Sequence, residues 1–170
     1  VLSDQKVDYS IKKKLELLNK ILLFAKNERL NVEGAYQDLI FNEGEAVSYV
    51  MQVANTDSLE QVTWWYPFVG RVPYKGYFTQ QEAQKAVMAW QNKNYDTYLG
   101  SVSAFSSLGW FEDPVFSSML NRREFDLAEL IFHELVHRTI WIAGSVELNE
   151  QLATYVAEKL TIKYLLSEKK

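Results

Sequence analysis

Residues 126–141 read Asp-Leu-Ala-Glu-Leu-Ile-Phe-His-Glu-Leu-Val-His-Arg-Thr-Ile-Trp and contain both histidines of the 170-residue chain. The stretch has no Gly or Pro before Gly144, and Asp126 and Glu129 have the spacing of a capping box. This pattern predicts a helix of about four turns from Leu127 to Trp141, with Asp126 as its N-cap. Apolar residues cover much of its surface, so we expect the helix to be buried.

The two histidines, His133 and His137, stand four residues apart and therefore lie on one face of that helix. Both rings can reach one ion, and Glu134 points close to that ion without binding it. This His-Glu-x-x-His arrangement is typical of zinc peptidases, in which the histidines bind the metal and the glutamate activates its water. The alternative is that both are core histidines whose ring nitrogens bond to neighbouring carbonyl groups.

Catalytic zinc usually has three protein ligands, so a third ligand is expected. Beyond His137 the sequence has no Asp, Cys or His, which leaves a glutamate on the next helix, predicted from Ser145 as N-cap to about Leu166. Two antiparallel helices joined around Gly144 would bring Glu150 back to the metal. Glu147 is the second candidate, although a carboxylate in a first helical turn is also explained by the helix dipole alone.

The residues around Glu150 carry a resemblance to known metallopeptidases. Asn149-Glu150-Gln151-Leu152-Ala153 resembles the N-E-x-x-A element of the gluzincins, whose glutamate is the third zinc ligand and whose alanine lets two helices approach. Four motifs between about residues 36 and 156 resemble, in the same order, a family of bacterial predicted aminopeptidases. They are residues 72–78, Val-Pro-Tyr-Lys-Gly-Tyr-Phe, residues 106–114, Ser-Ser-Leu-Gly-Trp-Phe-Glu-Asp-Pro, and residues 130–137 and 149–154.

That resemblance implies a gluzincin-like zinc peptidase, an aminopeptidase, acting on a peptide or protein substrate. Its Zn²⁺ would be held by His133, His137 and Glu150, with Glu134 as the general base. Two positions depart from the family. The family carries tyrosine where Phe105 stands, so a phenol that could stabilise an oxyanion is missing there, and it carries glutamate where Ala157 stands.

Other residues are candidates for supporting roles. A donor to the oxyanion is expected, with Tyr155 preferred over Tyr74, Tyr77 and Arg138. Thr154 and Asn149 could orient the imidazoles. Glu112 and Asp113 could bind the free amino terminus of a substrate, although turn chemistry ahead of Pro114 explains them equally well.

The composition limits the class of protein. With 48% apolar and 14% aromatic residues, the chain can form a packed core, and we expect one domain over residues 1–170, with about 1–34 as a helical amino-terminal segment. The net charge of −4 gives no support for nucleic-acid binding, and no apolar run is long enough for a membrane span. The sequence does not predict the oligomeric state.

The sequence leaves the cellular compartment open. Cysteine is absent, which excludes disulfides and cysteine-based metal sites but does not distinguish cytosol from periplasm. Members of the family that the chain resembles are longer at the amino end and look like lipoproteins. The resemblance therefore implies a periplasmic or membrane-anchored protein, and we expect that an amino-terminal segment has been removed.

Hydrophobic periodicity predicts an α+β fold, a small antiparallel or mixed sheet followed by the helical pair. In the gluzincin arrangement an edge strand beside the active-site helix binds the substrate, and the strand ending near Ser106 is the candidate. The elements predicted before the helical pair are a helix over Ser10–Arg29, strands over Ala46–Ala54, Val62–Val69 (interrupted by Pro67) and Tyr95–Phe105, a helix from the N-cap Thr79 to about Asn92, and a helical turn around Val115–Leu120.

Several aromatic residues could line a pocket for a substrate side chain, but core packing explains them as well. They are Trp64, Trp65, Tyr74, Tyr77, Trp110 and Phe111. Three other functions are compatible with the sequence: a catalytically inactive metal-binding or peptide-binding module descended from a peptidase, a metal-free interaction scaffold, and a metal-dependent hydrolase of non-peptide bonds. The first is disfavoured because all four expected catalytic and ligand residues are present.

Overall fold

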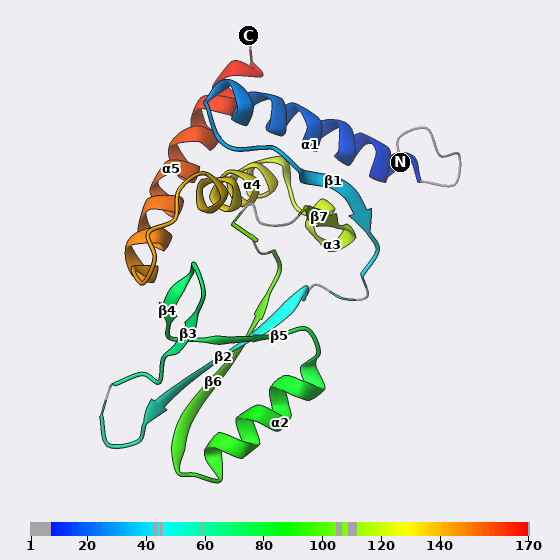
Figure 1. Ribbon diagram of the computed structural model, residues 1–170. Helices are drawn as coiled ribbons and strands as arrows, with labels where there is room; N and C mark the ends of the chain where they lie inside the picture. The colour runs from blue at the N-terminus through cyan, green and yellow to red at the C-terminus, as the bar shows by residue number, and fades with distance from the viewer. Residues whose placement is uncertain are drawn as a thin grey trace. The chain divides into compact units, whose positions relative to one another are not determined.

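The computed structural model describes residues 8–42, 44, 46–58, 60–104, 107–108 and 112–169. They group into two compact units, one made of residues 1–45, 104–141 and 147–170 and the other of residues 46–103 and 142–146. Helices and small sheets occur in the same chain, which confirms the predicted α+β class (Figure 1). The single domain predicted over residues 1–170 stays a prediction. No described helix is long and apolar enough to cross a membrane.

Three long helices build the core of the first unit. The aromatic rings of Phe24, Phe132 and Tyr164 meet there, with centroids 5.8, 5.4 and 6.2 Å apart in the three pairs. Such tilted and edge-on contacts are the favoured geometry of aromatic packing. The elements of this unit are α1 (Tyr9–Asn27), β1 (Ala35–Ile40), β7 (Asp113–Phe116), α3 (Ser117–Leu120), α4 (Glu124–Thr139) and α5 (Val146–Ser167).

The end of α1 is a Schellman motif, in which the last carbonyls of the helix are capped by the following backbone amides. The amide of Arg29 donates to the Lys26 carbonyl and that of Leu30 to the Ala25 carbonyl, both at 3.0 Å. Arg29 has a φ of 67°, which is the left-handed position where glycine is usually found. A non-glycine residue at this position is therefore strained.

Replacing the exposed Arg29 with glycine is expected to stabilise the protein by about 0.5–1 kcal/mol. The left-handed conformation costs other residues about 1–2 kcal/mol, and the greater entropy that glycine loses on folding takes back about 0.5–1 kcal/mol. The melting temperature should rise by about 2–3 °C. Arg29→Ala removes the same side chain but keeps the Cβ, so it should give no rise, and an equal rise in both variants would contradict the strain.

The first unit also contains a parallel pair of strands, β1 and β7, which was not predicted from the sequence. Ala35 pairs with Asp113 and Leu39 with Val115, so β1 advances four residues while β7 advances two. A bulge of this kind leaves residues unpaired and re-aims their side chains. Tyr36 lies inside this bulge, and its φ is 57°.

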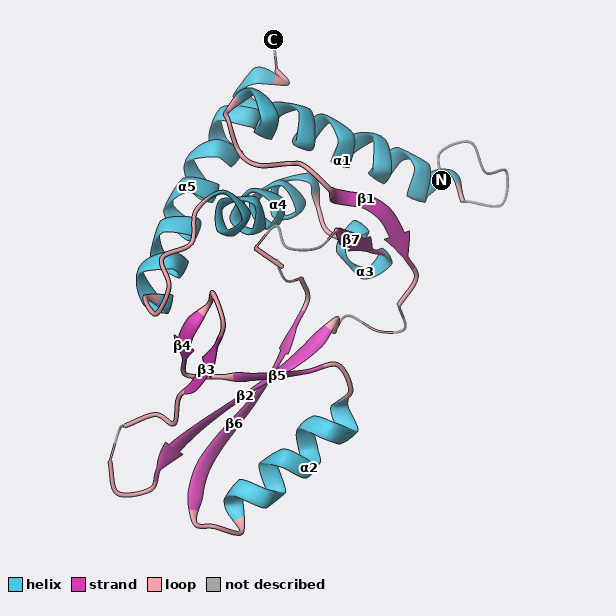
Figure 2. Ribbon diagram, in the orientation of Figure 1, coloured by secondary structure: helices cyan, strands magenta, loops and turns pink. Residues whose placement is uncertain are grey.

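The second unit is a three-stranded antiparallel sheet with strand order β5-β2-β6 and one helix against it, together with a hairpin of β3 and β4 (Figure 2). Trp90 of the helix packs edge-on against Tyr95 at 4.9 Å, and Gln91 Nε2 donates to Thr97 Oγ1 at 3.0 Å. The helix therefore covers the face of the sheet that carries Tyr95 and Thr97. The elements are β2 (Ser48–Asn55), β3 (Trp64–Tyr66), β4 (Gly70–Val72), β5 (Lys75–Tyr77), α2 (Gln80–Gln91) and β6 (Tyr95–Val102).

Most predicted elements occur with boundaries shifted by a few residues. Thr79 is the N-cap of α2 as predicted, accepting from the Glu82 amide at 3.3 Å and donating to its carboxylate at 2.9 Å. The strand predicted over Val62–Val69 is wrong as one element, because Pro67 cannot donate a ladder hydrogen bond and a turn there separates β3 from β4. The part of the predicted third strand at Phe105 lies outside the described residues.

The start of α4 also differs from the prediction. The helix begins at Glu124 after Arg123, so Asp126 is not its N-cap but lies in the first turn. There the Asp126 carboxylate accepts from the Arg123 guanidinium at 2.7 Å and still complements the helix dipole. The boundaries of the next helix agree better with the prediction. It was predicted from the N-cap Ser145 to about Leu166, and α5 begins directly after Ser145 and ends at Ser167.

Candidate metal centre

The structure brings His133, His137 and Glu150 together at the facing surfaces of α4 and α5. One ligand atom from each lies within 4.8 Å of the other two. The Nε2 atoms of His133 and His137 are 3.1 Å apart, and the Glu150 carboxylate places one oxygen 3.3 Å from the first and the other 3.4 Å from the second. Among the described residues this is the only such group.

These spacings fit a zinc ion. Zinc bonds to imidazole nitrogen and carboxylate oxygen are about 2.0–2.2 Å long, so neighbouring ligands of a tetrahedral ion lie about 3.3–3.6 Å apart. The two histidine nitrogens, 3.1 Å apart, are close to that edge length, and each lies 3.3–3.4 Å from a different oxygen of the Glu150 carboxylate. Two nitrogens and one carboxylate are also a donor set that catalytic zinc uses, with a fourth position left for water.

The side chains of His133, His137 and Glu150 interact electrostatically. Hydrogen bonds from His133 and His137 lower the pKa of Glu150 to about 2. The hydrogen bond to Glu150 in turn raises the pKa of His133, and the charge of Glu134 adds to this. Glu150 is half-exposed, so the centre opens to solvent on the side of α5.

Glu134 follows His133 on α4 and is partly buried. Burial raises the pKa of its carboxyl, while the charges of His137 and His133 oppose that effect. A carboxylate acting as a general base works best when its pKa is raised toward the working pH. Its position one residue from a ligand and its burial both agree with the predicted role.

The face of α4 that carries Arg138 is held by a buried ion pair. Arg138 Nη1 and Asp113 Oδ2 are 2.6 Å apart, and each side chain is 4% exposed. Arg138 also donates to the Glu33 carbonyl, and Asp113 accepts from the Ser107 amide at 3.0 Å. Arg138 was a candidate oxyanion donor and Asp113 a candidate for binding the substrate amino terminus, and the structure joins the two side chains to each other.

The remaining predicted residues are more scattered. Tyr155 is 61% exposed, about 140° around α5 from Glu150, with the Lys159 ammonium 5.4 Å from its ring centre. Its role as an oxyanion donor stays a prediction. Glu147 is exposed, accepts from Gln151 at 3.2 Å and does not join the cluster.

Further predicted residues lie apart from the cluster or outside the described part of the chain. Asn149 is buried and Thr154 is exposed. Tyr74 and Tyr77 belong to the other compact unit. Phe105, Ser106, Trp110 and Phe111 lie outside the described residues.

Two features of the centre were not visible in the sequence. Trp141, two residues beyond the end of α4, packs edge-on against the His137 ring at 5.5 Å. Nδ1 of His137 is buried and has no hydrogen-bond partner in the described part of the chain, whereas ligating histidines usually donate this proton.

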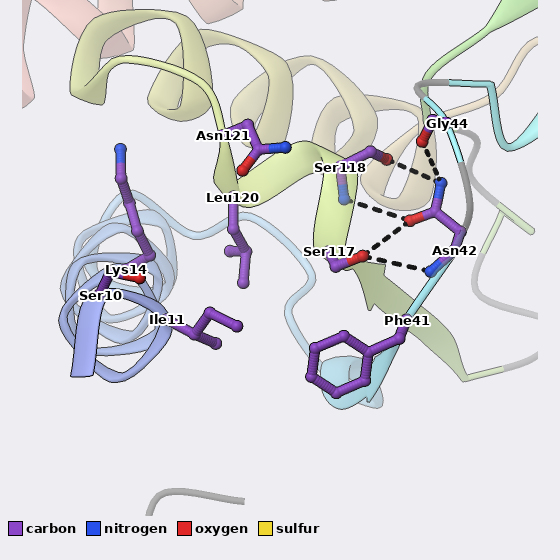
Figure 3. Close-up of a pocket in the computed structure, with 10 residues that line it drawn as sticks. All are labelled: Ser10, Ile11, Lys14, Phe41, Asn42, Gly44, Ser117, Ser118, Leu120 and Asn121. Carbon is purple, nitrogen blue, oxygen red and sulfur yellow. Dashed lines mark hydrogen bonds between the residues drawn. The ribbon is translucent and has the colours of Figure 1, made fainter. Parts of the chain in front are cut away.

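A cavity of about 600 Å³ opens elsewhere in the first unit (Figure 3). The amide oxygen of Asn42 accepts there from Ser117 Oγ and from the Ser118 amide, both at 3.1 Å. None of the predicted site residues lines it, so it is separate from the metal centre. Its lining residues are Ser10, Ile11, Lys14, Phe41, Asn42, Gly44, Ser117, Ser118, Leu120 and Asn121.

Comparison with known proteins adds one finding. A protein-family model described as "Putative aminopeptidase" matches residues 1–170. No curated protein and no solved structure matches the chain.

Proposed function

Since the chain belongs to the family described as "Putative aminopeptidase", we propose that it is a zinc-dependent peptidase that removes amino-terminal residues. His133, His137 and Glu150 would hold the metal. The observation that carries the proposal is the convergence of these three side chains at ligand spacings, 3.1–3.4 Å, from two different helices. A bound zinc ion supplies a Lewis acid that lowers the pKa of water and polarises a carbonyl group.

Glu134 would carry the proton in this reaction. Its carboxylate takes a proton from the attacking water and returns it to the nitrogen of the leaving amine. Burial supports this role because it raises the pKa of Glu134. To bind the metal, His133 and His137 must lose any proton at Nε2 that the Glu150 carboxylate stabilises, so zinc binding would release protons.

Recognition of a free amino terminus needs an anionic group near the metal. Of the two carboxylates predicted for this role, Asp113 is engaged with Arg138, whereas Glu112 is exposed. We therefore assign Glu112 as the candidate for binding the substrate ammonium. A peptide and its amino-terminally acetylated form should then be cleaved at different rates.

The matched carboxylates Glu147 and Glu150 give a direct test on one helix. Wild type and Glu147→Gln should bind one zinc ion, cleave an unblocked peptide and lose that activity with a chelator. In Glu150→Gln the zinc affinity should fall by more than about a hundredfold, since losing even an outer partner of a ligand costs 10–100-fold. Isothermal titration with Zn²⁺ and peptide assays by mass spectrometry measure both effects.

Chelation should also lower the melting temperature of wild type, because zinc binds the folded state. Stoichiometric zinc without cleavage of any peptide would contradict the peptidase and favour the inactive binding module. Equal zinc affinity in wild type and Glu150→Gln would contradict the ligand set. Cleavage of esters but not peptides would point to a hydrolase of another class.

A further inference from the structure

The turn between α4 and α5 joins the two helices that carry the three candidate ligands. The Ser145 amide closes it by donating to the Ile142 carbonyl at 3.1 Å. Gly144 has a φ of 76°, the left-handed value that glycine adopts at the third position of a type II turn. His137 stands shortly before this turn and Glu150 shortly after it. The path of the chain through the turn therefore affects how the ligands of the two helices meet.

The tip of the β3–β4 hairpin packs against this turn, and both segments belong to the second unit. The Gly144 amide donates to the Val69 carbonyl at 3.0 Å. At Gly70, a Cβ would overlap the Gly144 nitrogen and would lie 2.9 Å from the Gly144 Cα and 3.1 Å from the Ala143 carbonyl carbon. Carbon atoms in contact normally stand about 3.5–4.0 Å apart. Only glycine at position 70 therefore lets the two backbones approach this closely.

The hairpin tip has a strained backbone next to this contact. The Val69 amide donates to the Pro67 carbonyl at 2.8 Å, which makes a γ-turn centred on Phe68. Phe68 has a φ of 67°, so this is the rare and strained form of the γ-turn. Strained residues persist where the surrounding structure determines them, and they are concentrated at functional sites. Here the strained turn directly precedes the carbonyl that accepts from Gly144.

We propose that the β3–β4 hairpin positions the metal ligands, with Gly70 and the Val69 carbonyl fixing the α4–α5 turn. The inference rests on the proposed function, because the ligands that it positions are those of the proposed zinc site. Glu150 is half-exposed, and it faces both histidines only while the amino end of α5 stays in place. Ligands must be held within about 0.5 Å of their working geometry, and a fixed turn supplies such a constraint.

Gly70→Ala in the whole chain tests this contact. Its Cβ must displace the turn, and we expect the zinc affinity to fall about ten- to hundredfold, the usual loss when a group that orients a ligand is changed. Gly44→Ala is the matched control, because Gly44 has a φ of 83° but nothing lies within 4 Å of its Cβ. It should lose some stability through strain and keep the wild-type zinc affinity. Isothermal titration with Zn²⁺ and melting of the chelated proteins measure both effects.

A second readout needs no metal. The chain has no cysteine, so nitroxide labels on Ile140→Cys and Glu158→Cys report the distance between the end of α4 and the middle of α5. Both positions are exposed. The distance distribution, measured by pulsed electron paramagnetic resonance, should shift or broaden when Gly70→Ala is added and stay unchanged with Gly44→Ala. In wild type the Gly144 amide should exchange slowly with deuterium, and more slowly with zinc, because coupling between two sites is reciprocal.

The outcomes separate this inference from the proposed function. An unchanged zinc affinity in Gly70→Ala would overturn the inference and leave the proposed function standing. If wild type binds zinc but cleaves no peptide, a loss of affinity in Gly70→Ala supports the inference while the proposed function fails. If wild type binds no zinc, the label distances decide, and an unchanged distance in Gly70→Ala overturns the inference. If Gly70→Ala does not fold, a Gly144 amide of wild type that exchanges at the unprotected rate overturns it.

Discussion

Glu134→Gln is expected to lower kcat/KM for peptide cleavage by about 10²–10⁴-fold, the usual contribution of a general base. Glutamine has nearly the shape of glutamate, so the α4 backbone and its two histidines should stay in place. The zinc content should therefore equal that of wild type. Removing a buried carboxylate should also leave the protein folded, because burial already disfavours the charged form of Glu134.

Glu129→Gln is the matched control for this change. Glu129 is a glutamate of the same helix, one turn before His133, and its charge acts on His133 without taking part in the cluster. It should retain most of the wild-type rate. A Glu134→Gln variant that cleaves peptides at the wild-type rate would show that another group accepts the proton, even if the metal site is correct.

The parts of the candidate metal centre that the sequence predicted depend on local periodicity. His133 and His137 are four residues apart in a segment without Gly or Pro, which is enough to place both on one helical face. Glu150 was found because a break at Gly144 and a following helix leave few arrangements for a third ligand. The structure confirms that these three side chains converge, within 4.8 Å.

The structural features that the sequence did not predict depend on contacts between residues distant in the chain. β7 contains Pro114 and has only four residues, so its sequence shows no alternation of apolar and polar residues. Its partner β1 is distant in the chain, because the residues of the second unit stand between the two strands in the sequence. The ion pair of Arg138 and Asp113 follows from that pairing. From the sequence, Asp113 was therefore explained as part of a turn or as a substrate contact, although its partner Arg138 is on α4.

The backbone conformation of Tyr36 could not be predicted from the sequence either. Its φ of 57° results from a two-residue mismatch between β1 and β7, which no residue pattern in residues 35–40 encodes. Single-residue propensities place an aromatic residue in a regular strand, where φ is negative. The left-handed backbone of Tyr36 could be found only after the register of the strand pair was known.

Asp113→Ala is expected to lower the free energy of unfolding by about 3–5 kcal/mol, because it leaves the guanidinium of Arg138 buried without its carboxylate. Ala also removes the acceptor of the Ser107 amide. Since Arg138 follows His137 and ties α4 to β7, this ion pair couples the stability of the first unit to the candidate metal centre. Urea denaturation of the chelated protein measures the loss.

A double variant separates the charge from the packing. Asp113→Ala with Arg138→Met removes both charges, and it should recover much of the lost stability, because an apolar pair avoids the desolvation cost of two buried ions. Asp126→Ala breaks the exposed pair with Arg123, which has a similar contact distance of 2.7 Å, and should change the denaturation midpoint little. If the single Asp113 variant were as stable as wild type, Arg138 would have to reach water or another partner, and the buried pair could not be what holds α4 against β7.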